Sequence, residues 1–236
     1  YMPVENLNQI EVIKGASSVL FGSSALNGAI NLRTRFPGNE PKTEVTLFGG
    51  VYLEPERKEM VWWERKPLMA GASFSHLRKI GNLDLSVGGN YYKNEGYRTG
   101  DHQHHLRGNL GLRYRFKKIE RLSVGVNISG MFLDKSDFLL WQDADSGIYI
   151  QNPESIVPLT GHRYNIDPYL EYFTPGGDKH TLKTRLYSLG NATLDEQKNS
   201  FTKLWYGEYR FLKRFGDQIN WTSGFAFSRN TVLANF

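Results

Sequence analysis

The sequence predicts a mainly β fold: a transmembrane antiparallel β-barrel, present in part, that follows a small α+β segment. Three observations favour this fold class. Segments of about ten residues alternate between apolar and polar positions, as barrel strands do. The connections between these segments alternate between short and long. The chain also has a mean hydropathy of -0.49 and 14% aromatic residues. The low hydropathy suits a barrel because only every second strand residue faces lipid, and the aromatic residues are expected at the two membrane interfaces.

Alternation is clearest between Leu106 and Phe116. The even-numbered positions carry no charge there, whereas Arg107, Arg113 and Arg115 share the odd-numbered face. Arg or Lys facing lipid at the bilayer midplane costs about 2 to 4 kcal/mol, so the odd face is expected to line a wet interior. Lys203 breaks parity, and we expect its stem to reach the membrane interface. Segments with the same pattern are 83–91, 122–132, 164–172, 182–189, 205–211 and 219–227.

The connections fall into two classes along about nine strands that are expected from Glu44 onward. Short connections lie near 78–82, 117–121, 175–179 and 213–217, and long ones near 54–66, 93–105, 134–162 and 191–200. Transmembrane barrels have short turns on one side of the membrane and longer loops on the other. Because bacterial barrels close with an even number of strands, the chain is expected to be incomplete.

Residues 10–35 form a different unit. Ile10 to Lys14 alternates as a short strand, and Gly15 permits a turn at its end. A helical turn is expected over 18–21, ended by Gly22. Gly28 then permits close approach of the backbone before a strand over 29–34. Two prolines and a glycine in 37–41 indicate a linker, so we place the first domain at 1–38 and the barrel at 39–236.

A resemblance rests on Ile10-Glu11-Val12-Ile13-Lys14-Gly15, Phe21-Gly22-Ser23 and Asn27-Gly28-Ala29-Ile30-Asn31-Leu32. These stretches resemble the end of the plug domain of TonB-dependent outer-membrane receptors. The family usually has tyrosine where this chain has Phe21 and a second glycine where it has Ala29. Alanine after Lys14-Gly15 and asparagine before Gly28 are similar to receptors of Bacteroidetes-type bacteria.

The resemblance implies the C-terminal part of a plug followed by the first barrel strands, the first of which rises from the periplasm. It implies a transporter in the outer membrane of a Gram-negative bacterium, not an enzyme, with no cofactor. The cargo would be a siderophore, cobalamin, a glycan or a peptide. TonB with its inner-membrane energising complex and outer-membrane lipid would be partners, with the TonB contact segment and a signal peptide outside this chain.

The resemblance also implies roles for individual residues. Four plug charges would be available to pair with the lumen, and three glycines would be structural turn residues: Glu11, Lys14, Arg33 and Arg35, and Gly15, Gly22 and Gly28. A net charge of +5 could suggest nucleic acid, but the basic residues fall on lumen-facing positions and in turns. Nucleic acid is therefore not expected as a partner.

Candidate binding residues lie in two of the expected loops. Trp141, Asp143, Asp145 and Tyr149 could contact a sugar or peptide. His102, His104 and His105 beside Asp101 could bind a metal, although such clusters are more often solvated surface. The chain has no cysteine for disulfides or thiol ligands.

Two other functions stay open at this point. One is a passive outer-membrane barrel or adhesin without energy coupling. The other is a barrel enzyme that uses the histidine loop, although the sequence carries no phosphate-binding loop, nucleophile elbow or H-E-x-x-H motif.

Overall fold

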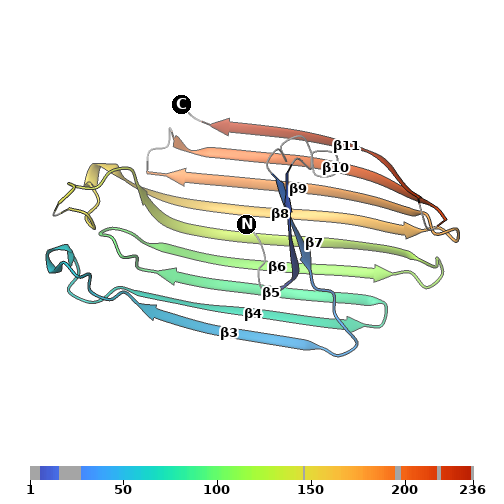
Figure 1. The fold of residues 1–236 in the computed structure, drawn as a ribbon, viewed down its shortest axis with the longest axis horizontal. Helices are drawn as coiled ribbons and strands as arrows, with labels where there is room; N and C mark the ends of the chain where they lie inside the picture. Colours follow the sequence, from blue (N-terminus) through green and yellow to red (C-terminus); the bar gives the residue numbers. More distant parts are fainter. Residues whose placement is uncertain (1–5, 16–27, 146, 195–197, 217–218, 235–236) are drawn as a thin grey trace.

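The computed structural model describes residues 6–15, 28–145, 147–194, 198–216 and 219–234 (Figure 1). Its two sheets are both antiparallel. The smaller pairs β1 (Leu7–Lys14) with β2 (Gly28–Thr34). The larger has nine strands: β3 (Lys42–Val51), β4 (Leu68–Ile80), β5 (Leu83–Asn94), β6 (Gln103–Arg115), β7 (Leu122–Phe138), β8 (Ile156–Phe173), β9 (Lys179–Thr193), β10 (Ser200–Phe215) and β11 (Ile219–Ala234).

Each strand of the large sheet pairs with its neighbours in the chain, from β3 at one edge to β11 at the other. The sheet curves, and the β1–β2 pair crosses its strands at a steep angle (Figure 1). Two short 3-10 helices lie in connections, η2 at Lys58–Met60 and η3 at Pro153–Ser155. Among the residues described, no helix is long and apolar enough to span a membrane.

The alternation of connection lengths is confirmed. At one end of the sheet the connections 81–82, 116–121 and 174–178 are short, and at the other end 52–67, 95–102 and 139–155 are longer. The connection from Thr193 to Ser200, which was expected to be long, has no more residues than 116–121, although it is longer than the connection from Phe215 to Ile219 that follows it. Because consecutive strands are antiparallel, all short turns lie at one end of the sheet and all loops at the other. Three of the turns place a glycine at positive φ, whereas the turn 116–121 places Arg121 there, at φ 64°.

Several expected strand ends are wrong at the loop side of the sheet. β7 continues to Phe138 rather than ending near 132, and β8 begins at Ile156 rather than near 164. Their pairing runs without interruption from Leu122–Tyr172 to Phe138–Ile156. Beyond the membrane, backbone hydrogen bonds can continue a strand without an apolar face, so hydropathy alternation stops before the strand does.

The two faces of the large sheet have the expected polarity. Large apolar side chains on the outward face are exposed, including Leu47 at 77% and Phe225 at 71%. Buried hydrophobic side chains among the described residues are few, namely Met60, Leu77 and Leu133. A water-soluble sheet would cover so large an apolar face, whereas a barrel presents it to lipid. The fold class predicted from the sequence is confirmed.

Candidate functional site

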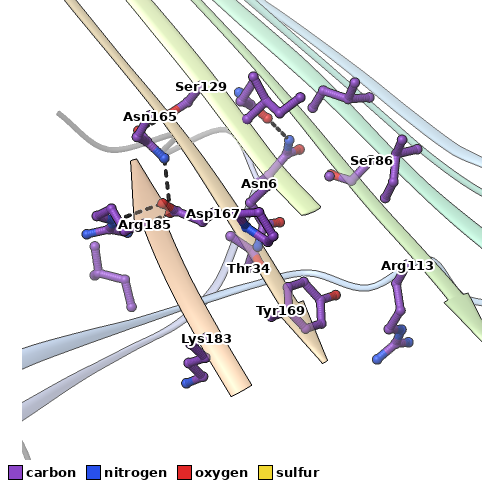
Figure 2. Close-up of a pocket in the computed structure, with 18 of the residues that line it drawn as sticks. Asn6, Thr34, Ser86, Arg113, Ser129, Asn165, Asp167, Tyr169, Lys183 and Arg185 are labelled. Carbon is purple, nitrogen blue, oxygen red and sulfur yellow. Dashed lines mark hydrogen bonds and ion pairs between the residues drawn. The ribbon is translucent and has the colours of Figure 1, made fainter. Parts of the chain in front are cut away.

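A cavity of about 730 Å³ lies between the β1–β2 pair and the inward face of the large sheet (Figure 2). Asn6, Thr34 and residues 35–37 line it from the β1–β2 side. Strands β5 to β10 contribute the opposite wall, which includes Ser86, Asn109, Arg113, Asn165, Lys183 and Tyr206. The face that parity assigned to a wet interior is therefore the face that meets the β1–β2 pair.

Asn6 joins the start of β1 to the wall. Its side chain is buried, and Nδ2 donates a hydrogen bond to Oδ1 of Asn109 on β6. Its backbone carbonyl accepts a hydrogen bond of 2.8 Å from the N–H of Arg35. Gly88 lies beneath both amides, because a Cβ there would stand 2.8 Å from Asn6 Nδ2 and 2.7 Å from Asn109 Nδ2. The contact therefore needs a residue without a side chain at position 88.

Arg35, which follows β2, contacts both β1 and β3. Its Nε donates to the carbonyl of Leu7 at 2.9 Å, and its Nη1 lies 2.9 Å from Oε2 of Glu44 on β3. Arg35 therefore ties the β1–β2 pair together and ties it to the first barrel strand.

Phe36 and Pro37 complete the attachment. The guanidinium carbon of Arg113 lies 3.5 Å from the centroid of the Phe36 ring, a cation–π contact. Pro37 is buried. We call Arg35, Phe36 and Pro37, with Glu44 and Arg113, the linker clamp. The clamp fixes the chain where it passes from one sheet to the other.

Asp84 binds Arg113 of the linker clamp. It is only 2% exposed, and its carboxylate accepts hydrogen bonds from Arg113 and Arg115, including 2.8 Å from Arg113 Nε and 2.7 Å from Arg115 Nη2. A buried carboxylate needs such partners, because an unpaired buried charge is costly. Two guanidinium groups against one carboxylate leave this part of the wall positively charged.

A row of polar side chains, joined by hydrogen bonds, crosses the wall from β7 to β9. Ser129 Oγ donates to Asn165 Oδ1, and Asn165 Nδ2 donates to Asp167 Oδ2 at 3.0 Å. Arg185 binds both carboxylate oxygens of Asp167, at 2.9 and 2.6 Å (Figure 2). These groups bond one another across three strands, so the wall is hydrophilic and rigid.

The other plug charges singled out in the sequence lie away from the wall. Arg33 forms an ion pair of 3.0 Å with Glu11, whose carboxylate also accepts from Asn31 Nδ2 at 2.8 Å, so both charges pair within the β1–β2 sheet. Lys14 is exposed. Of the three predicted turn glycines, Gly15 has φ 91° and Gly28 has φ 141°, which favour glycine. Gly22 and the expected helical turn over 18–21 lie outside the described residues.

A second cavity, of about 490 Å³, opens on the inward face nearer the loop end of β3 to β6. Phe48 stacks on Tyr92, with ring centroids 6.1 Å apart, and Tyr92 lies 5.2 Å from His105. The remaining lining residues are Thr46, Ser73, Asn90 and Arg107. Sequence reasoning assigned aromatic residues to the lipid interfaces and missed this inward group, although the parity of Arg107 and His105 could have indicated it.

The histidines do not form the loop cluster that the sequence suggested. His104 and His105 lie in β6, which begins at Gln103, so their placement in a long loop was wrong. His105 bonds the inward Asn90 at 2.8 Å, so the preceding strand residue, His104, points to the opposite face. The His104 ring lies 5.9 Å from the ring of His102, and His102 Nε2 lies 3.2 Å from Asp134. The described residues contain no group of three side chains suited to a metal ion.

The candidate substrate contacts of the loop 139–155 take part in packing among the loops. Trp141 packs on Phe138 at 4.5 Å between ring centroids, and Tyr149 packs edge-on against Tyr97 at 5.6 Å. Asp143 accepts hydrogen bonds from the N–H groups of Asp145 and Gly147. A role of these four residues in cargo binding stays a prediction.

Glu95 links two of the long loops. Its carboxylate accepts a hydrogen bond of 2.9 Å from the N–H of Leu68 and pairs with Arg65 at 3.0 Å. The Leu68 hydrogen bond, followed by Arg65, holds the pKa of Glu95 below its ordinary value.

The sequence of the first 29 residues and the fold of the whole chain both match known receptors. The family model described as TonB-dependent Receptor Plug Domain matches residues 1–29. The chain carries the plug sequence and the barrel fold of a TonB-dependent receptor. The match to the plug model includes β1 and reaches the start of β2, and the sheet of β3 to β11 has the fold of the barrel strands of the matched receptors.

Three solved structures share this fold. The ferric-catecholate import receptor Fiu from E. coli K12 matches with a TM-score of 0.72 and 13% identity, over 96% of this chain and 40% of that one. The siderophore receptors PirA and PiuA from Acinetobacter baumannii match with TM-scores of 0.71 and 0.66 and identities of 16% and 12%. These matches cover 98% and 96% of this chain, and 36% and 35% of theirs. The chain therefore spans well under half of each matched chain, and all three are receptors rather than enzymes.

Proposed function

We propose that this receptor takes up an iron–siderophore complex across the outer membrane of a Gram-negative bacterium, driven by TonB. The observation that carries the proposal is the position of the β1–β2 hairpin, which lies against the polar inward face of a sheet whose outward face is apolar. The resemblance of the fold to import receptors for siderophores supports this cargo class over a glycan, peptide or cobalamin.

The charge of the wall favours an anionic cargo. Arg113 and Arg115 lie on the inward face against the single carboxylate of Asp84, so two guanidinium groups face one negative charge. The inward rings of Phe48 and Tyr92 add a surface on which a planar group of the cargo could lie. An anionic iron chelate with aromatic arms matches both properties.

The linker clamp suggests how force would open the plug. The outer membrane sustains no ion gradient, so work must reach the plug mechanically from the inner membrane. Force applied to the chain before Asn6 would reach β1 at Leu7, while the clamp holds β2 at Arg35. Leu7 pairs with Thr34, so the pulled end and the held end are adjacent, and the pairs of the hairpin would open one after another.

Uptake of a radiolabelled iron chelate tests this function. A strain that lacks the gene is complemented with the full-length receptor, in cells with and without TonB, and is offered a ferric catecholate or vitamin B12. We expect accumulation of the iron chelate only when receptor and TonB are both present. Equal uptake without TonB would instead indicate a passive barrel, and uptake of vitamin B12 alone would reject the siderophore.

A further inference from the structure

Three hydrogen-bond donors line up across the wall of the larger cavity, from β6 to β9. The register of the strands places four residues in one row: Arg113, Gly125, Tyr169 and Lys183. A Cβ at Gly125 would stand 2.5 Å from the hydroxyl oxygen of Tyr169, so the Tyr169 side chain crosses β7 toward β6. Figure 2 shows Tyr169 between Lys183 and Arg113, and all three line the cavity. We call Arg113, Tyr169 and Lys183 the inner donor row.

Each member of the row keeps a donor that the described part of the chain does not use. Asp84 accepts from Nε and Nη2 of Arg113, which leaves Nη1 of Arg113 without a partner there. The Tyr169 hydroxyl donates to none of the described residues, and Lys183 Nζ forms no ion pair with them. Tyr169 and Lys183 are register partners on adjacent strands, where Cβ atoms lie about 4.5 to 5.5 Å apart. The row therefore presents three donors to the cavity.

The carboxylates nearby leave the row positively charged. Asp84 is shared by Arg113 and Arg115, so two guanidinium groups face one negative charge. The other carboxylates on the inward face in this half of the sheet are each paired with a cation other than Lys183: Glu171 with Lys179 at 2.7 Å, Asp167 with Arg185 at 2.6 Å, and Glu208 with Arg210 at 2.7 Å. The charge of Lys183 thus has no counter-ion among the described residues.

The contact between Asn6 and Asn109 separates this row from the second cavity. Arg107 lines the second cavity and Arg113 belongs to the row, and the two lie six residues apart on β6, roughly 20 Å along the strand. Asn109, which binds Asn6, lies between them. Short turns of outer-membrane barrels face the periplasm, and the row lies toward the short-turn end of the sheet. The row is therefore on the periplasmic side of the Asn6 contact.

Position, charge and free donors together specify a ligand. We propose that the inner donor row is a second cargo site, which binds an anionic oxygen group, a catecholate or carboxylate, after the cargo leaves the second cavity. Guanidinium, ammonium and phenol groups all donate to such oxygens, and the Tyr169 ring offers a face to a planar arm. The cargo reaches the row when Asn6 leaves Asn109. This inference rests on the proposed function, since it concerns the same anionic cargo.

Protection of Lys183 from acetylation tests the site in purified, full-length receptor. Acetic anhydride modifies accessible amines, and peptide mass spectrometry measures the modification of Lys183 at increasing concentrations of 2,3-dihydroxybenzoate, an iron-free anionic catechol. We expect this probe to protect Lys183 and to leave the exposed Lys66 of the loop 52–67 unprotected. The neutral amide of the probe should protect Lys183 far less, because it lacks the carboxylate.

Two variants keep Lys183 and remove its neighbours in the row. Arg113→Gln should raise the probe concentration for half-protection about tenfold or more, which is the usual effect of losing a hydrogen bond from a charged group. Arg115 still pairs with Asp84 in this variant, so the buried carboxylate keeps a partner. Tyr169→Phe removes only the hydroxyl and should also weaken protection. Thermal unfolding checks that each variant is folded.

Uptake distinguishes an inner site from the outer one. Lys183→Gln should bind a ferric catecholate at the cell surface as wild type does when TonB is absent, and should accumulate it more slowly when TonB is present. Lys183→Arg should restore the rate. Lys213→Gln is the matched control, because Lys213 lies on the outward face of the neighbouring strand β10 and its change removes the same charge.

Four results would overturn the inference. These are a Lys183 that does not react without probe, which would mean that another part of the receptor fills the site, no protection by the probe, equal protection by the neutral amide, and loss of surface binding in Lys183→Gln. A wild type that accumulates no ferric catecholate would instead reject the proposed function, and protection of Lys183 by the anion would remain measurable, because acetylation needs no uptake.

Discussion

At the scale of single residues, the plug is held by a few side chains that contact the barrel wall. Asn6 and Arg35 reach Asn109 and Glu44, and Phe36 lies under Arg113. Sequence motifs indicated that Arg35 was a plug charge, but they could not indicate its partner, which lies on another sheet. Asn6 and Gly88 carry no sequence signal, because a close approach of two amides over a glycine exists only after folding.

Replacing Gly88 by alanine should loosen the plug. The added Cβ would stand under 3 Å from the amide nitrogens of Asn6 and Asn109, and overpacking of this kind costs about 1 to 3 kcal/mol. We expect faster hydrogen exchange in β1 of Gly88→Ala, with barrel strands unaffected. Gly207→Ala is the matched control, since a Cβ there meets nothing within 4 Å. Wild-type exchange in Gly88→Ala would contradict this account of the contact.

The Arg35–Glu44 pair should contribute modestly. Both side chains are about a third exposed or more, at 34% and 43%, and solvent screens the attraction between the charges of an exposed pair. Arg35→Gln should cost more than Glu44→Gln, because Arg35 also bonds the Leu7 carbonyl. A double-mutant cycle on exchange in β1 measures the coupling, which should fall as salt rises. Equal effects of the two single changes would reject the second role of Arg35.

At the scale of elements, alternation predicted the barrel strands where lipid lies outside and water inside. It could not predict the loop ends of β6, β7 and β8, because outside the membrane both faces are wet and the pattern loses its cause. The same limit placed His104 and His105 in a loop. Packing among the loops likewise depends on contacts such as the hydrogen bond from Leu68 to Glu95, which no local sequence pattern predicts.

Acid should release the loop 52–67 from the loop 95–102. The pKa of Glu95 is lowered in the folded loop, so its ionised form stabilises the contact above the unfolded pKa, and this stabilisation is lost as pH falls through the folded pKa. Hydrogen exchange at Leu68 should be slow at pH 7 and, after correction for intrinsic rates, should lose its protection only as the pH falls below the ordinary pKa of a glutamate, about 4.3. Glu95→Gln should lose protection already at pH 7, whereas Glu64→Gln, at an exposed position in the loop 52–67, should not. Protection independent of pH in wild type would rule out this role.

At the scale of the whole molecule, the two faces of the large sheet differ in polarity. On β10 the outward residues between Lys203 and Lys213 are uncharged, and the inward face of the sheet carries charges that pair with one another and with Arg35. This division was predictable, since parity alone assigns a face to each strand residue. The position of the plug and the clamp that fixes it required the three-dimensional structure.

The central claim is that the plug hairpin must open for cargo to pass. Val12 and Ile30 are register partners on β1 and β2, and the chain has no cysteine of its own. Val12→Cys/Ile30→Cys therefore allows one disulfide that locks the hairpin, with each single variant as its control. Uptake of labelled ferric siderophore is measured in cells with TonB, before and after a reductant. We expect the oxidised double variant to be inactive and reduction to restore uptake, whereas full uptake with the disulfide intact would contradict opening of the hairpin.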